Sequence, residues 1–314
     1  MRFLIASIIF LAGALAMHAA GEPGIIKGSD QFEFVYRVRL PEIKGEARVW
    51  MPLAKTDAFQ TVTAEELSIP IKWEKVQDRD YGNDICLLNL QTEDSGKIIE
   101  LRYRVLRKEK TAYATTDLNV GRYLRPETLV PVSQTFKAIA EQATLGKTSD
   151  LERAKALYDH VLGRMRYDKS GIAWGRGDAV FACDARTGNC TDFQAYFIAL
   201  ARSIGIPARF AIGATIPAEK NEGIIEGYHC WAEFFAEGRW VPVDISEAWK
   251  NPKLAHYYFG HNPANRFELT KGRDLVVDPE PASGPINFLV YPLLEMGGKI
   301  VKAETTFTFR RIGT

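Results

Sequence analysis

The sequence has almost no excess of charge of either sign. Its 314 residues include 40 Lys and Arg against 39 Asp and Glu, and no tract of basic residues stands out. A protein that binds nucleic acid normally clusters Lys and Arg to offset the charge of the phosphates. We therefore expect no nucleic-acid partner. The balanced total leaves small charged substrates open, because a local patch can exist within a neutral protein.

Long hydrophobic runs are also scarce. Residues 3–17 form an uncharged apolar run after Arg2, and small residues follow as far as Ala20. This pattern predicts a signal peptide over residues 1–20, with the cleavage site left open. The run is shorter than the ~20 apolar residues that a membrane span needs, so a retained anchor is the weaker alternative. Because no second such run follows, we expect an exported protein, periplasmic or extracellular, without a membrane span after signal removal.

Cysteine is the third scarce feature. The chain has four cysteines, and an even number in an exported protein allows disulfides. A core of this size does not need them, so the sequence leaves open whether Cys86, Cys183 or Cys230 is paired. The histidines outside the motifs below show no ligand spacing with cysteines or acids. We therefore expect no catalytic metal and no cofactor.

The hydrophobic pattern changes between the two halves of the chain. Alternating runs predict strands at residues 32–40, 47–51, 71–76, 85–90 and 99–106. Helical spacing then predicts helices at 132–145, 149–165 and 191–204, with a loop at 168–189, and further strands at 208–214, 227–235, 240–245, 275–277, 287–291 and 305–309. The fold class is therefore α+β. We predict an antiparallel β-sandwich-like domain over 28–125, a domain of helices on an antiparallel sheet over 126–275, and C-terminal strands over 276–314 that pack on both.

Cys190 stands at the start of the predicted helix over 191–204. Unpaired backbone N–H groups and the helix dipole favour negative charge there, which lowers the pKa of a thiol and raises the reactive thiolate fraction. The same N–H groups can hold the oxyanion of an acyl-transfer intermediate. Many cysteines at helix starts are nevertheless inert, so the position alone is a moderate indication.

A predicted hairpin supplies the groups that such a thiolate needs. If Glu237 and Gly238 form its turn, Trp231 faces Asp244 across the two strands, and His229 lies diagonal to Asp244 on the same face. The imidazole could then take the proton of the Cys190 thiol while the carboxylate fixes its tautomer. A bulge of one residue would break this arrangement.

These motifs resemble the transglutaminase-like superfamily over roughly residues 130–250. The matching segments are Gly-Asn-Cys-Thr-Asp at 188–192, Ala-Arg-Ser-Ile-Gly-Ile-Pro-Ala-Arg at 201–209, His-Cys-Trp-Ala-Glu at 229–233 and Trp-Val-Pro-Val-Asp at 240–244. The resemblance implies a papain-like core, with the nucleophile at a helix start and the His and Asp on neighbouring strands, in that order along the chain. It also implies acyl transfer through a thioester.

The family further uses a Trp, Tyr or Gln to help hold the oxyanion, which makes Trp174 and Tyr167 weak candidates here. Trp231 shares the predicted face of His229 and is a weak candidate for lining the cleft, although it equally fits the core. Cross-linking members of the superfamily in eukaryotes use calcium, but this chain has no acidic loop of the EF-hand pattern.

We therefore expect a cysteine peptidase or amidase with the triad Cys190, His229 and Asp244, acting on a peptide or protein of the cell envelope. Two alternatives stay open: a protein-glutamine γ-glutamyltransferase, and a non-catalytic envelope scaffold that keeps the fold. The intact set of Cys, His and Asp argues against the scaffold. The sequence leaves the substrate, the choice of water or amine as acceptor, and the oligomeric state undecided.

Overall fold

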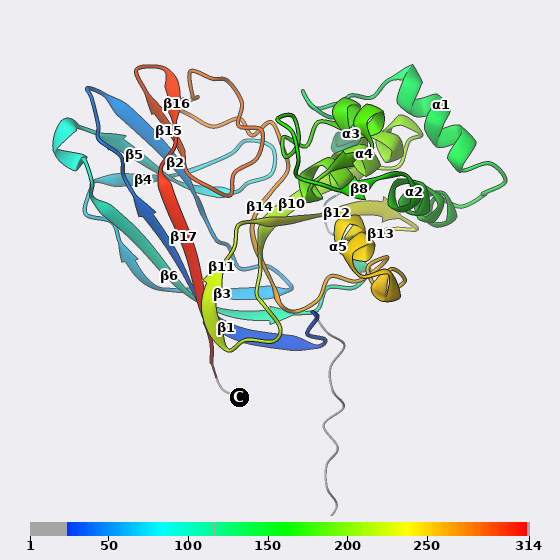
Figure 1. The fold of residues 1–314 in the computed structure, drawn as a ribbon, viewed down its shortest axis with the longest axis horizontal. Coiled ribbons are helices and arrows are strands. Elements are labelled where there is room, and N and C mark those ends of the chain that lie inside the picture. The colour runs from blue at the N-terminus through cyan, green and yellow to red at the C-terminus, as the bar shows by residue number, and fades with distance from the viewer. Residues whose placement is uncertain (1–23, 116, 118, 313–314) are drawn as a thin grey trace, which may run out of the picture.

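The computed structural model describes residues 24–115, 117 and 119–312, so the predicted signal peptide lies outside the described residues. Strands fill one side of the molecule, and the helices gather on the other side (Figure 1). Two five-stranded antiparallel sheets face each other on the strand side. A third five-stranded sheet joins them to the helices.

Sheets A and B form the sandwich. Sheet A has the order β11-β17-β1-β6-β3, with bounds Glu222–Ile225, Glu304–Arg311, Ser29–Arg39, Ile98–Lys108 and Gln60–Ser68. Sheet B has the order β16-β15-β2-β5-β4, with bounds Lys299–Val301, Leu293–Met296, Ala47–Leu53, Asp84–Leu90 and Trp73–Gln77. In β1 every second side chain, from Phe32 to Val38, is fully buried, because a pleated strand sends alternate side chains to opposite faces. Both ends of the chain contribute, since β1 pairs with β17 along its length.

Sheet C carries the helices. Its order is β14-β10-β12-β13-β7, with bounds Arg266–Lys271, Ala208–Thr215, His229–Ala236, Arg239–Val243 and Tyr113–Ala114. The helices are α1 (Gln134–Ala143), α2 (Asp150–Arg164), α3 (Ala179–Ala185), α4 (Cys190–Ser203) and α5 (Ile245–Lys250), with 3-10 turns η1 (Thr92–Asp94), η2 (Val120–Leu124) and η3 (Pro252–Leu254). A short parallel pair, β8 (Arg166–Tyr167) and β9 (Thr187–Gly188), leads into α4.

Helix α4 is the central helix of this half. All of its residues are buried, and it packs against β10 and β12 on one side and against α1, α2 and α3 on others. A capping box begins α2: the Ser149 hydroxyl accepts the N–H of Glu152, whose carboxylate accepts the N–H of Ser149. The α+β class and the antiparallel sheets are as predicted.

Three local predictions are wrong. The loop over 168–189 contains α3, because Asp178 caps it by accepting the N–H groups of the next turn. Residues 275–277 and 287–291 are not strands. Leu275 makes a single bridge, and the carbonyl of Val290 accepts a side-chain hydroxyl rather than a strand N–H. Both segments are rich in apolar residues because Leu275, Val277 and Leu289 pack into a buried hydrophobic cluster, not because they extend a sheet.

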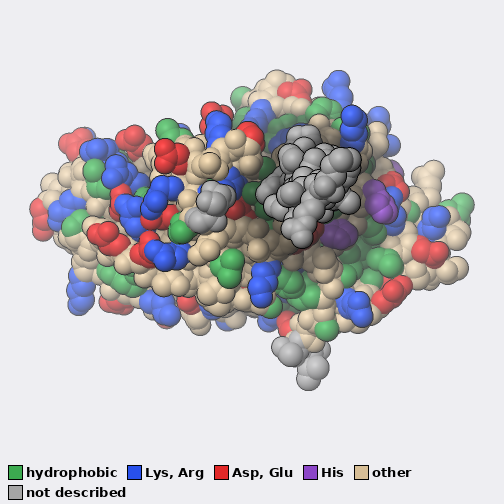
Figure 2. Space-filling model, turned by 90° about the horizontal axis from the view of Figure 1, so that it is seen from below, with side chains coloured by type: hydrophobic (Ala, Val, Ile, Leu, Met, Phe, Trp, Pro, Cys, Tyr) green, Lys and Arg blue, Asp and Glu red, His purple; other side chains and the backbone are tan. Residues whose placement is uncertain are grey.

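Lys and Arg side chains alternate with Asp and Glu over the sandwich on the face that Figure 2 shows. No single-sign patch covers the sandwich in this view, in keeping with the formal net charge of +1. Within the described residues, no helix has the length and apolar character of a membrane span.

Candidate active site

Cys190 is the first residue of α4, and the sequence before it fixes the start of the helix. Asn189 is the N-cap, and its side chain accepts the N–H of Thr191 at 3.0 Å. Gly188 precedes it with φ +151°, where an added Cβ would lie only 2.5 Å from the Cβ of Asp192. Glycine is therefore required at this point for the chain to approach the first turn of α4.

Asp192 fastens the neighbouring loop to this helix start. Its carboxylate accepts three backbone N–H groups, from Asn189 at 2.9 Å, Gly175 at 2.7 Å and Gly177 at 3.0 Å. Burial raises the pKa of this carboxyl in spite of those bonds. Asp192 therefore stabilises the start of α4 and the loop at 175–177 together.

The predicted hairpin register is confirmed. Ala236 pairs with Arg239 and Ala232 with Val243, so no bulge interrupts β12 and β13. The two turn residues, Glu237 and Gly238, have φ of 52° and 76°, and positive values at both positions are typical of a type I′ hairpin turn.

This register brings His229 to Asp244. Nε2 of His229 lies 2.6 Å from Oδ2 of the carboxylate, and both side chains are buried. Strand β13 ends at Val243, before the predicted end at 245, because Asp244 caps α5 by accepting the N–H of Glu247 at 3.1 Å. The same residue thus orients the imidazole and begins a helix.

Further partners satisfy the buried Asp244 carboxylate. The Ser246 hydroxyl donates to Oδ1 at 3.1 Å, and the guanidinium of Arg266, itself fully buried, lies 3.7 Å from Oδ2. Burial alone would raise the pKa of Asp244, but His229 and Arg266 hold it below its usual value. The carboxylate is therefore ionised at neutral pH.

The Cys190 thiol lies between two hydrogen-bond partners. The thiol of Cys230 and the imidazole of His229 both bond to it, and together they hold the pKa of Cys190 well below that of an ordinary thiol, against the effect of burial. Burial would lower the pKa of His229, but Asp244 and Cys190 raise it to about 9. Since Nε2 faces Asp244, Nδ1 is the atom left for the sulfur. Both shifts favour the thiolate–imidazolium pair over the neutral pair.

The three other predicted site residues, Tyr167, Trp174 and Trp231, have different surroundings. Tyr167 lies close enough to Cys190 that, after burial, the thiolate is the next cause of its raised pKa, and Lys250 stands 4.2 Å from its ring centre. The indole N–H of Trp174 is committed to the carbonyl of Gly171 at 3.1 Å. Trp231 is fully buried with its ring 6.3 Å from that of His229, so it packs under the imidazole rather than lining an open cleft.

Sequence reasoning missed two residues beside Cys190. The sequence leaves open whether Cys230 is paired; in the structure all four cysteines are free, and Cys230 instead bonds to Cys190. Tyr228 was not considered, and its hydroxyl accepts from Nδ2 of Asn189 at 3.0 Å. The sequence did offer one indication of both residues, because Tyr228 and Cys230 directly flank His229.

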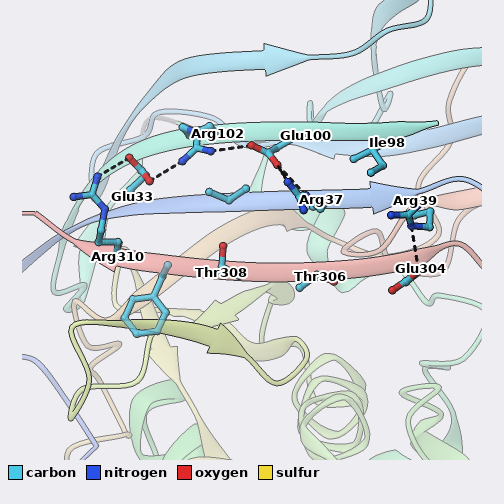
Figure 3. Close-up of a pocket in the computed structure, with 12 residues that line it drawn as sticks. Glu33, Arg37, Arg39, Ile98, Glu100, Arg102, Glu304, Thr306, Thr308 and Arg310 are labelled. Carbon is cyan, nitrogen blue, oxygen red and sulfur yellow. Dashed lines mark hydrogen bonds and ion pairs between the residues drawn. The ribbon is translucent and has the colours of Figure 1, made fainter. Parts of the chain in front are cut away.

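A surface groove outside this site lacks its combination of Cys, His and Asp. Figure 3 shows this groove of ≈ 440 Å³, which has a charged lining and lies on the outer face of sheet A. Its acids and arginines pair with one another, as in Glu33 with Arg102 at 2.8 Å and Glu100 with Arg37 at 2.7 Å. Neither Cys nor His lines it. Within the described residues, no group of three or more His, Cys, Asp and Glu is arranged to hold a metal ion.

The chain is similar to several known proteins. Residues 137–245 match the family model of the transglutaminase-like superfamily. An uncharacterized protein of Haemophilus influenzae is 25% identical over 95% of both chains. The uncharacterized protein YebA of Bacillus subtilis is 26% identical over 60% of this chain, which spans about a quarter (26%) of YebA.

A solved structure shares the fold. The crystal structure of a candidate cysteine protease from Cytophaga hutchinsonii superimposes with a TM-score of 0.62 over 92% of each chain, at 14% identity. The family match includes Cys190, His229 and Asp244 and ends just after the last of them. Residues 137–245, which carry the candidate site, are therefore similar to the transglutaminase-like superfamily.

Proposed function

We propose that this protein is an exported cysteine enzyme that cleaves peptide or amide bonds through a thioester on Cys190. The observation that carries the proposal is the continuous line of contacts from Cys190 through His229 to Asp244, buried at the start of α4. A structural histidine needs no such ordering of a thiol, an imidazole and a carboxylate.

In the first step the Cys190 thiolate attacks the carbonyl carbon of the substrate. The thiol proton already resides on His229, because Asp244 stabilises the imidazolium. The sulfur–carbon bond forms while the carbonyl electron pair moves to oxygen. Backbone N–H groups at the start of α4, that of Cys190 among them, would receive the oxyanion, and Tyr167 is a side-chain candidate for the same role.

The intermediate then collapses to a thioester. The carbon–nitrogen bond breaks, and the leaving amine takes the proton from His229. In the second step an acceptor attacks the thioester, with His229 now acting as the base, and Cys190 is released. Water as acceptor gives hydrolysis, whereas a primary amine gives a new amide bond.

We favour water as the acceptor and a peptide or protein of the cell envelope as the substrate. The apolar run over 3–17 supports export and therefore a substrate outside the cytoplasm. The thioester itself can react with either water or an amine, so the site does not decide between them. The preference for hydrolysis therefore rests on the resemblance to the family. The transferase reading is the second candidate on the same site.

One experiment separates these outcomes. The mature protein is incubated with a library of cell-envelope peptides, with and without a primary amine, and the products are identified by mass. The proposal predicts shortened peptides in both samples and none with Cys190→Ala. Amine adducts as the main product would favour the γ-glutamyltransferase. No product from a folded protein would favour a non-catalytic scaffold.

A further inference from the structure

Aromatic side chains from two distant parts of the chain meet beside Cys190. Tyr228 directly precedes His229, and its ring centre lies 5.8 Å from that of Tyr291 and 6.0 Å from that of Phe288. Tyr291 and Phe288 lie beyond residues 137–245, so the family match does not include them. We call Tyr228, Phe288 and Tyr291 the aromatic wall.

The segment 288–291, which carries Phe288 and Tyr291, is held in place by its neighbours. The hydroxyl of Tyr36, from β1, donates to the carbonyl of Val290 at 2.9 Å, and that of Thr270, from β14, donates to the carbonyl of Leu289 at 2.6 Å. The Tyr291 ring stacks on that of Phe307, with centres 5.5 Å apart and planes at 18°. Sheets A and C therefore fix its position.

The phenol of Tyr291 faces the catalytic strand. Its oxygen accepts the backbone N–H of Tyr228 and lies 3.5 Å from where a Cβ at Gly227 would stand. The Tyr228 ring, 5.8 Å from that of Tyr291, carries a hydroxyl that accepts from Asn189, the residue before Cys190, at 3.0 Å, so the two phenols lie beside the start of α4. Besides burial, a thiolate at Cys190 raises the pKa of Tyr291.

Tyr291 is nevertheless open to a ligand. Its side chain is 37% exposed, an unusual fraction for a large aromatic residue beside a buried thiol. Its oxygen already accepts a bond, and no acceptor within the described part of the chain takes its proton. A stacked ring with a free O–H beside the nucleophile offers both a flat apolar face and a hydrogen-bond donor.

We propose that Tyr291, with Tyr228 behind it, is the specificity-determining contact for the acyl donor. The wall packs against an aromatic side chain on the acyl side of the scissile bond, and the Tyr291 hydroxyl donates to a backbone carbonyl of the same peptide. The substrate class is thus an extended peptide with an aromatic residue at that position. This inference rests on the proposed function, because it assumes that Cys190 is the nucleophile.

Peptidyl chloromethyl ketones test it. The Cys190 thiolate displaces chloride from the methylene carbon, forming a stable thioether, so the inactivation rate reports recognition of the acyl group. Rates are measured with a Phe ketone, an Ala ketone and iodoacetamide, which has no acyl group to recognise. The variants are Tyr291→Ala, Tyr291→Phe and the control Tyr257→Ala, which removes a tyrosine that is also stacked, on His261, at 4.9 Å.

The wild type should react about tenfold faster with the Phe ketone than with the Ala ketone. Tyr291→Ala should bring this ratio near one and leave the iodoacetamide rate unchanged. Tyr291→Phe should keep the ratio but slow both ketones by about two- to tenfold, since the ring is kept and only the hydroxyl, with its hydrogen bonds, is lost. Tyr257→Ala should match the wild type in every rate.

Two results would overturn the inference: a ratio that survives Tyr291→Ala, or an iodoacetamide rate that falls as far as the ketone rates in that variant, which would indicate a structural role. The failure of the proposed function looks different. In that case Cys190 of the wild type would react with neither ketones nor iodoacetamide faster than an ordinary buried thiol.

Discussion

Nε2 of His229 and Oδ2 of Asp244 lie 2.6 Å apart although fifteen residues separate them along the chain. The tight turn at Glu237 and Gly238 sets the strand register that makes this contact. Because the carboxylate occupies Nε2, the imidazole presents Nδ1 to Cys190. The hairpin therefore determines which nitrogen handles the proton in the proposed reaction.

Replacing Asp244 by Asn should leave the imidazole bonded but without a charged partner. We expect the rate of peptide cleavage to fall by about 10²–10⁴-fold, because the amide no longer stabilises the imidazolium or fixes its tautomer. Steady-state kinetics measure this loss. Asp159→Asn, an exposed acid paired with Lys155, serves as the control and should not change the rate. An unchanged rate in Asp244→Asn would mean that another group orients His229.

The pH dependence follows from the raised pKa of His229. Activity should persist through neutral pH and decline as pH rises through about 9, where the imidazolium loses the proton needed by the leaving amine. A raised folded-state pKa also means that the ion pair contributes stability fully below the unfolded value of about 6.5, and that this contribution is lost as pH rises through about 9. Urea titrations between pH 6 and 10 measure it. A base limb near 6.5 would contradict the assignment.

Cys230 should tune the nucleophile without reacting. Its thiol donates to Cys190 and is the largest cause of the lowered pKa there. In Cys230→Ala we expect the acid limb of the activity profile to move to higher pH while activity at pH 8 is largely retained. Cys183→Ala, which removes a half-buried thiol elsewhere, is the matched control. Complete loss of activity in a folded Cys230→Ala protein would assign Cys230 a larger role.

Replacing Gly188 by alanine should destabilise the folded protein. Gly188→Ala forces a Cβ against Asp192 in a backbone conformation that alanine rarely adopts, and we expect a loss of about 1–3 kcal/mol in the free energy of unfolding. Gly163→Ala, in the last turn of α2 with open space around it, should instead be neutral or stabilise by up to about 1 kcal/mol. Urea unfolding of both variants decides this, and equal effects would refute the steric argument.

The sequence predicted the α+β class and the His229–Asp244 contact because both depend on local pattern. Alternation defines strands, and a short turn sets the register of the hairpin that follows. The short helix α5 was missed, because Asp244 looked like the end of a strand until its capping of Glu247 was seen. The catalytic roles and the domain boundaries remain predictions.

The aromatic wall and the Cys230 bond could not be predicted in the same way. Tyr291 reaches Tyr228 across more than sixty residues, and only the packing of sheet A against sheet C brings them together. Cys230 follows His229 directly, so alternation placed the two on opposite faces. The sequence carries no pattern for contacts that depend on how whole sheets pack.

The central claim is a thioester on Cys190, and trapping that intermediate tests it most directly. The mature protein is mixed with peptide substrate, quenched in acid within the first turnover, and mapped by mass spectrometry. We predict an acyl adduct on the peptide containing Cys190, absent in Cys190→Ala and accumulating in Asp244→Asn only at its reduced rate. Peptide cleavage without an adduct on Cys190, or cleavage that continues in Cys190→Ala, would contradict the account.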